Sequence, residues 1–276
     1  MLQHKRKNIT MGKDKSSGGN KQMKSFWNSM IAAFASYSVI PMPNIELTED
    51  ESKYQLCFFP LIGAVIGLLL YGWSVAWPYL CNYNFLPAVV YAIVPIIISG
   101  ATHVDGFIVA VDAICNHKPV EKKLEILRDT HIGSFAIIMS ISYFLVYLGV
   151  WSEMPIDAIP LLAVGFVLSR ALSGFAIVTF PHARTSNLRK RYADDKTKGI
   201  VRIVMAVYIA VCAVVMCVLQ PIYGCIGVFG AAISFAFYYY ISKTNFGGIT
   251  GAVTSFFIQI CELIVPLVVL IGWKFV

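Results

Sequence analysis

The chain carries a succession of long apolar segments, and these restrict its possible folds more than any other feature. Several approach or exceed the roughly 20 residues that an α-helix needs to cross the hydrocarbon core of a membrane. Charged residues make up only 13% of the 276 positions, whereas a soluble domain carries about a quarter. No long series of alternating ten-residue segments is present, which argues against an outer-membrane barrel. The sequence therefore predicts an all-α fold, a polytopic integral membrane helical bundle.

Seven apolar segments are predicted as membrane spans. They cover residues 54–80, 85–100, 132–150, 158–180, 200–219, 222–241 and 249–273. The first contains Gly63 and Gly67 in a GxxxG spacing, which allows two helices to approach closely. A shorter apolar segment, 25–39, is below the length of a span and is predicted as an interfacial or re-entrant helix. Residues 1–22 are expected to form a disordered basic tail, and residues 23–276 a single membrane-embedded domain.

The basic residues predict the orientation of the spans. Lys and Arg gather in the N-terminal tail, around 118–128 and between 184 and 202, and such an excess marks cytoplasmic loops. We therefore expect a multi-pass protein of the inner (cytoplasmic) membrane whose active face is cytoplasmic. The net charge of +7 is then explained first by this orientation, and the same basic patches are compatible with phosphate-bearing substrates. Membrane lipid is the expected environment, and nucleic acid is not an expected partner.

Seven cysteines are spread along the chain, most of them inside predicted spans. No two have CxxC spacing or another spacing typical of metal ligands. They are predicted to be small core residues and not disulfides or a zinc site.

One polar stretch, residues 99–134, interrupts the apolar pattern, and the chemistry is expected there because ionisable groups in membranes are costly to keep. Asp105 and Asp112 are about two turns apart, so both face the same side of one helix. Such a pair can share divalent cations, and Mg²⁺ is usual where substrate phosphates complete the coordination. His103 is a candidate for orienting a carboxylate or acting as a base. The alternative is that these groups cap helices and bind water.

The end of this stretch opens the third predicted span. Asp129 and Thr130 are suited to cap that helix, whose exposed N–H groups attract anions. Capping does not account for Arg128, His131 and Gly133 beside them. Asp129 and His131 are therefore candidate catalytic residues, and Arg128 is a candidate phosphate contact.

Three further places are predicted to contact phosphate. Arg170 lies inside the fourth span, where it either neutralises a phosphate or pairs with a carboxylate such as Glu262. Arg184 belongs to a basic loop, which is either a signal of cytoplasmic location or a phosphate contact. The glycine-rich turn at 247–251 is of a kind that cradles phosphate, with an ordinary loop as the alternative. Its candidate residues are Gly247, Gly248 and Thr250.

Several motifs together resemble the cobalamin synthase family. They are SGATHVDG at 99–106, Asp112, EKKLEILRDTHIGSFA at 121–136, FFPLIGAVIG at 58–67 and NFGGITG at 245–251. The resemblance extends from about residue 23 to the end of the chain. The central stretch is its specific part, because apolar spans alone match many transporters.

The resemblance implies a transferase that acts late in vitamin B12 biosynthesis. A hydroxyl of α-ribazole, or of its 5′-phosphate, attacks the cobinamide-side phosphorus of adenosylcobinamide-GDP, GMP leaves, and Mg²⁺ is needed. By similarity, His103, Asp105 and Asp112 match the HxDG…D motif, and Asp129 with Gly133 the DxxIG motif. This places Asp105 and Asp112 on Mg²⁺ and leaves His103 or Asp129 as the base. An oligomer is compatible with this interpretation.

Two positions depart from the family pattern. The helix usually carries another Asp four residues after the first, where this chain has Val109. The glycine-rich turn usually reads GGxTGD, where this chain has Ala252. Each change removes an expected metal ligand. The alternatives to an active enzyme are an impaired cobinamide-binding paralogue or inactivated variant, a membrane transporter and a lipid-head-group phosphotransferase.

Overall fold

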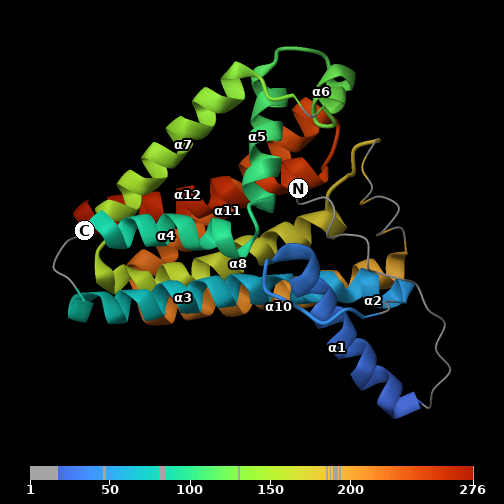
Figure 1. Ribbon diagram of the computed structural model, residues 1–276, viewed down its shortest axis with the longest axis horizontal. Helices are drawn as coiled ribbons and strands as arrows, with labels where there is room; N and C mark the ends of the chain where they lie inside the picture. The colour runs from blue at the N-terminus through green and yellow to red at the C-terminus, as the bar shows by residue number, and fades with distance from the viewer. Residues whose placement is uncertain are drawn as a thin grey trace.

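The computed structural model describes residues 18–45, 48–80, 85–129, 131–184, 186, 188, 192 and 194–275, and these are largely helical (Figure 1). The helices are α1 (Gly18–Tyr37), α2 (Glu49–Tyr54), η2 (Gln55–Phe58), α3 (Phe59–Leu80), α4 (Phe85–Ile98), α5 (Thr102–Cys115), α6 (Val120–Ile126), α7 (Ser134–Ser152), η3 (Ile156–Ala158), α8 (Ile159–Thr179), α10 (Asp195–Leu219), α11 (Pro221–Phe246) and α12 (Gly251–Phe275). The predicted all-α membrane bundle is confirmed.

Six helical segments are long and apolar enough to cross a membrane. They are Glu51–Leu80, Ser134–Ser152, Ile156–Thr179, Asp195–Leu219, Pro221–Phe246 and Gly251–Phe275. Each coincides with a segment predicted from hydropathy. The helices extend a few polar residues beyond the apolar segments, because a helix continues past the hydrocarbon boundary until a cap or a proline ends it.

Helix α8 is the centre of the bundle and packs against α3 and α10, which run beside it (Figure 1). Gly63 and Gly67 lie on the face of α3 that meets α8. A Cβ atom at Gly63 would collide with the carbonyl group of Phe166, and one at Gly67 with that of Ala163. The GxxxG spacing therefore brings the two backbones into direct contact, as predicted.

The second predicted span, 85–100, is broken, which corrects the sequence-based boundary. Helix α4 ends after 14 residues, about 21 Å, too short to cross a membrane by itself. Helix α5 then leaves at an angle of 92°. Gly100 and Ala101 in the turn have φ values of 61° and 57°, a conformation that alanine rarely adopts. The described part of the chain thus has six helices able to span a membrane, or seven if α4 and α5 together count as one span.

The N-terminal helix α1 is not among the six spans. It begins at Gly18, so residues 18–22 of the predicted tail are helical, and the rest of that tail lies outside the described residues. Its exposed apolar side chains are Met23, Phe26 and Trp27. After α1 the chain reaches the break, where the Val39 N–H donates to the Ile98 carbonyl oxygen at 2.9 Å.

Candidate active site

Polar residues from several segments meet around the far end of α5. The first contact joins α5 to the segment that precedes α7. The Gly133 N–H donates a hydrogen bond to Oδ2 of Asp112 at 3.2 Å. A Cβ atom at Gly133 would collide with the same carboxylate. Glycine is therefore needed at this position, because the backbone lies directly against the Asp112 side chain.

Asp129 and His131 form an exposed pair just before α7. Oδ1 of Asp129 accepts from the His131 backbone N–H at 3.0 Å and lies 2.8 Å from Nδ1 of its ring. The His131 side chain is 92% exposed, so Nε2 faces water. A carboxylate on one ring nitrogen fixes the tautomer and leaves the other nitrogen to exchange protons. Arg128 is exposed beside this pair, and Thr130 lies outside the described residues.

The first turn of α5 packs against the start of α12. A Cβ atom at Gly106 would lie 2.7 Å from Oγ of Ser255 and 3.3 Å from Cα of Ala252. Position 252 is thus beside the turn that carries Asp105, which is exposed. Val109 is four residues beyond Asp105, on the same face of α5. Both departures from the family pattern therefore lie next to the predicted metal ligands.

The glycine-rich turn lies against the loop that follows α8. The Ile249 N–H donates to the Pro181 carbonyl oxygen at 2.9 Å, and the Ala183 N–H donates to that of Ile249 at 3.1 Å. Gly248 has a φ of 147°, and a Cβ atom there would collide with the same loop. This pairing brings the turn to the neighbourhood of the exposed Arg184.

Within the turn, Gly247 and Thr250 also have defined structural parts. Gly247 ends α11 with a φ of 63°, the left-handed conformation that commonly ends helices. Oγ1 of Thr250 accepts from the Val253 N–H at 3.3 Å, so this buried side chain caps the start of α12. Thr250 belongs to the turn that is predicted to bind phosphate, but its hydroxyl already has a structural role as a helix cap.

Helix α6 links the two halves of this region, a role that the sequence did not reveal. Lys123 is only 8% exposed, and its Nζ donates to Oδ1 of Asn245 at 2.6 Å. Lys122 and Glu125 pair at 2.9 Å on the exposed face of the same helix. Sequence analysis could not separate Lys123 from these neighbours because all three belong to one charged run.

Two open pockets lie at this end of the molecule. The first, about 670 Å³, lies between the end of α8 and the start of α10 and includes His182, Lys198 and Arg202 in its lining. The second, about 430 Å³, lies beneath α6 and is lined by Lys118, Lys122, Glu125, Ile126 and Asp129. Both pockets carry two cationic side chains, and the second includes a candidate catalytic residue. Arg189, Lys190 and Arg191 of the basic loop lie outside the described residues.

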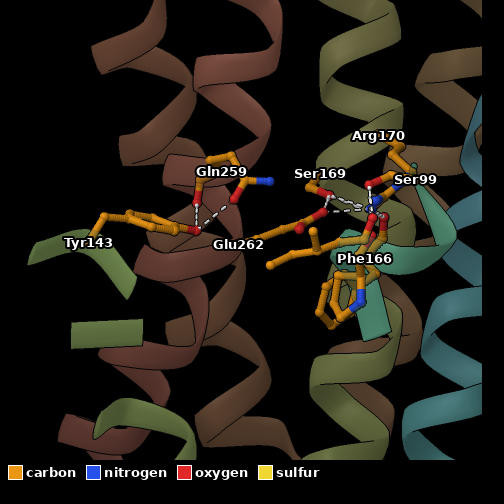
Figure 2. A network of polar contacts seen from close by, with 9 residues as sticks. Ser99, Tyr143, Phe166, Ser169, Arg170, Gln259 and Glu262 are labelled. Atoms are coloured by element: carbon orange, nitrogen blue, oxygen red, sulfur yellow. Dashed lines mark hydrogen bonds and ion pairs between the residues drawn. The ribbon is translucent and has the colours of Figure 1, made fainter. Parts of the chain in front are cut away.

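Arg170 is not exposed in this region and instead belongs to a buried network between α8 and α12 (Figure 2). Its Nη1 lies 2.6 Å from Oε1 of Glu262, and both side chains are almost completely buried. Oγ of Ser169 donates to the same carboxylate oxygen at 3.2 Å, and Nη1 also bonds the Phe166 carbonyl oxygen at 2.9 Å. The ion pair that the sequence left open is present.

His103 is also buried, at the first turn of α5. It is 5% exposed, and its ring lies 5.8 Å from that of Phe59. Among the described residues, neither ring nitrogen has a hydrogen-bond partner. Asp105 is exposed two residues later. The structure therefore separates His103 from the exposed pair Asp129–His131, although all three belong to the same polar stretch.

The carboxylates of α5 do not form a complete metal cage. Among the residues that the structure describes, no three His, Cys, Asp or Glu side chains gather closely enough to hold a metal ion. Asp105 and Asp112 are about 10 Å apart along the helix axis, too far to bind one ion together directly. The residues present fit a magnesium ion held by one carboxylate and completed by substrate phosphates and water.

Comparison with known proteins identifies the same family as the sequence motifs. Residues 29–270 match the family model described as cobalamin-5-phosphate synthase. An adenosylcobinamide-GDP ribazoletransferase of Lachnoclostridium phytofermentans is 38% identical over 245 residues, which are 89% of this chain and 94% of that protein. Proteins of the same name from Clostridium botulinum and Clostridium perfringens are each 28% identical, over 88% and 87% of this chain and 96% of each relative.

No solved structure matches the chain significantly, so the assignment depends on sequence. The family match covers five of the six spans in full, the sixth as far as residue 270, the broken pair α4–α5 and all the segments that meet around Asp112. A chance likeness between apolar helices would not preserve near full-length coverage in both partners. The chain therefore belongs to the cobalamin-5-phosphate synthase family of transferases.

Proposed function

We propose that this chain transfers the adenosylcobinamide phosphoryl group from adenosylcobinamide-GDP to α-ribazole or its 5′-phosphate, a late step in vitamin B12 biosynthesis. The observation that supports this most is the contact between Asp112 and Gly133. It joins a carboxylate to the anion-attracting start of α7. Acidic groups for a metal and backbone N–H groups for phosphate thus share one place, as phosphoryl transfer requires.

The diphosphate of the donor would lie between α7 and the glycine-rich turn. The start of α7 and the exposed Arg128 belong to one side of this region. Gly247, Gly248 and Arg184 belong to the other side, which α6 connects through Lys123 and Asn245. Phosphate groups are well matched by such N–H groups and guanidinium groups. Arg170 is left out of this proposal because its guanidinium is committed to Glu262.

His131 is the proposed base, with Asp129 as the residue that orients it. The acceptor hydroxyl gives its proton to Nε2 of His131 while its oxygen forms a bond to the cobinamide-side phosphorus. The bond from that phosphorus to the bridging oxygen breaks, and the oxygen leaves with GMP. Asp129 holds Nδ1 and stabilises the imidazolium that forms. The buried His103 serves better as a packing residue near the start of α5.

Magnesium is the proposed cofactor, and Asp105 and Asp112 are the residues that would hold it. Because the two are about 10 Å apart along the helix axis, each would hold an ion of its own through one carboxylate, and the phosphates of the donor would complete the coordination. When bound, the ion neutralises the charge that develops on the phosphate oxygens.

The inner membrane is the proposed location, with the site facing the cytoplasm. Basic side chains gather at the end of the bundle that holds the candidate active site: Lys118, Lys122, Arg128, Arg184 and Lys198. Lys274 lies at the other end, where it pairs with Glu153. An excess of positive charge at one end indicates the cytoplasmic side, where nucleotide substrates are available.

The test is turnover by the purified protein in detergent, with adenosylcobinamide-GDP and α-ribazole, in the presence and absence of Mg²⁺. We expect magnesium-dependent release of GMP with formation of the cobalamin product. The parallel reaction with the 5′-phosphate identifies the preferred acceptor. Turnover that is equal with and without Mg²⁺, after treatment with a chelator, would contradict the metal part of the proposal.

A catalytically impaired paralogue is the second candidate, and Val109 and Ala252 are the observations that favour it. Both positions adjoin the predicted metal ligands, and neither supplies a carboxylate. The variant Val109→Asp with Ala252→Asp decides between the two functions. An inactive parent and an active double variant would identify an intact scaffold with a disabled metal site. No turnover and no binding of adenosylcobinamide-GDP in either form would overturn the functional assignment.

A further inference from the structure

Two cysteines face each other across the turn between α10 and α11, at the end of the bundle opposite the candidate active site. Cys217 is in the last turn of α10 and Cys225 near the start of α11. Their Sγ atoms are 3.5 Å apart. Cys225 is exposed and Cys217 partly exposed, whereas Cys212 and Cys261 are buried. The prediction that the cysteines are core residues thus does not hold for this pair.

The backbones of the two helices are in direct contact beside the sulfur atoms. A Cβ atom at Gly224 would collide with the carbonyl group of Met216 and lie 2.7 Å from the backbone nitrogen of Cys217. The Gly224 N–H also donates to the Gln220 carbonyl oxygen at 2.7 Å. A disulfide requires Cα atoms within about 7 Å. The backbones are in contact at Gly224, next to Cys225, and the sulfur atoms are already within 3.5 Å, so the pair is placed for a disulfide.

The surroundings of this turn place it at the opposite end from the basic residues of the site. The Gln220 side-chain amide donates to the Asp157 carbonyl oxygen at 2.8 Å, and Glu153 and Lys274 pair at the same end. If the basic end is cytoplasmic, this turn faces the outside of the membrane. Thiols on that side meet an oxidising environment, in which disulfides form and persist.

We propose that Cys217 and Cys225 form a disulfide that closes the α10–α11 hairpin on the outer face of the membrane. A bond forms between the two Sγ atoms, and the two thiols together give up two protons and two electrons. The oxidant is another disulfide, that of a thiol-oxidising protein or of a small molecule, and it becomes two thiols. The outer location rests on the orientation proposed above, whereas the pairing itself rests on the contact between the sulfur atoms.

The pairing is tested on the full-length protein, purified in detergent and treated with oxidised glutathione. Free thiols are alkylated, and the peptide containing both cysteines is examined by mass spectrometry. We expect this peptide to lose two hydrogens and to resist alkylation until a reductant is added. Full alkylation of both cysteines after oxidation, or a glutathione adduct on Cys225 without the internal bond, would overturn the pairing.

Three single variants provide the controls. Cys217→Ser and Cys225→Ser should each leave the remaining thiol of the pair open to alkylation after oxidation. Cys212→Ser, on the same helix but buried, should leave the oxidation unchanged. If Cys212→Ser also prevents the bond, the pairing is not specific and the proposal is wrong.

The location is tested separately in intact cells that express Cys217→Ser. A maleimide that cannot cross membranes should label Cys225 without permeabilisation. Labelling only after permeabilisation would overturn the outer location and, with it, the proposed cytoplasmic face of the active site. That result would leave the pairing and the transferase activity unaffected, so the separate failures are distinguishable.

Discussion

The two groups of charged residues in this protein differ in what surrounds them. Arg170 and Glu262 lie between α8 and α12, where each is almost fully buried and the charges satisfy one another. The Asp129–His131 pair is exposed in front of α7, and Asp112, only partly buried, contacts the Gly133 backbone beside it. The first group has no exposed surface for a ligand. The second presents side-chain atoms to water.

The difference shows that cost alone does not identify a functional charge in a membrane protein. Because burying a charge in a membrane protein costs free energy, Arg170 is the more conspicuous candidate for a functional residue. Its geometry is that of an internal ion pair that ties two spans together. The residues around Asp112 cost less free energy to keep because they are partly or fully exposed, and they are the ones proposed to contact a phosphate. The following predictions test this separation between a structural and a functional group.

The largest effect is expected from Glu262→Ala, which leaves the Arg170 guanidinium buried without a counter-charge. Loss of one partner of a buried pair costs about 3–5 kcal/mol. Thermal unfolding in detergent should show a large loss of stability. The double variant Arg170→Met with Glu262→Met should recover most of it and keep turnover. Loss of turnover in a stable double variant would mean that Arg170 acts on substrate and that the two groups are not separate.

The second effect concerns the base. His131→Asn removes the proposed proton acceptor and is expected to lower kcat roughly 100-fold, within the range for general base catalysis, with little change in unfolding temperature. Steady-state rates measured across pH give the comparison. His117→Asn, an exposed histidine in the same stretch, is the matched control. Equal rates for the two variants would remove His131 from the mechanism.

A smaller effect on activity is expected at the contact between the Gly133 backbone and the Asp112 carboxylate. Gly133→Ala places a methyl group against the Asp112 side chain and should lower kcat/KM about 10-fold through displacement of the metal ligand. Gly149→Ala, within α7, is the control, since a Cβ atom there meets no described atom within 4 Å. That control should be neutral or slightly stabilising. An unimpaired Gly133→Ala enzyme would show that the contact does not position Asp112.

The smallest effect distinguishes two adjacent lysines of α6. Lys123→Met removes the hydrogen bond to Asn245 and should cost about 1 kcal/mol of stability. Lys122→Met breaks only an exposed pair with Glu125 and should cost almost nothing. Denaturant or thermal unfolding of both variants checks this. If both variants unfold like the parent, α6 does not fasten the two halves of the site.

Hydropathy predicted the spans well because each long apolar segment has one low-energy solution in a membrane, a helix. The GxxxG spacing likewise identified a close contact, since few residues other than glycine allow one. The break between α4 and α5 could not be predicted in this way. Gly100 gives a hint, but Ala101 adopts a left-handed φ that its sequence context does not indicate. It is held there by the surrounding chain, including the Val39–Ile98 hydrogen bond.

The sequence predicted which residues belong to the candidate site better than it predicted how they are arranged in space. Asp105, Asp112 and the segment 128–133 were recognisable from their motifs. The sequence could not tell that His103 turns inward while His131 remains exposed, because both are polar residues in one stretch. It also could not tell that Lys123 is buried, since this depends on the end of α11, more than 100 residues away. The burial of His103 and Lys123 depends on packing between distant segments, which the local sequence pattern does not indicate.

The short helix α4 has a consequence for the surrounding lipid. Its 14 residues span about 21 Å, whereas the hydrocarbon core is about 30 Å thick. Helix α5, which carries Asp105 and Asp112, then leaves at 92°, so the bilayer beside α4 would have to thin or be replaced by protein and water. The aqueous phase would thereby extend inward toward α5. Under the proposed function, a polar substrate would reach the carboxylates of α5 without entering the acyl-chain region.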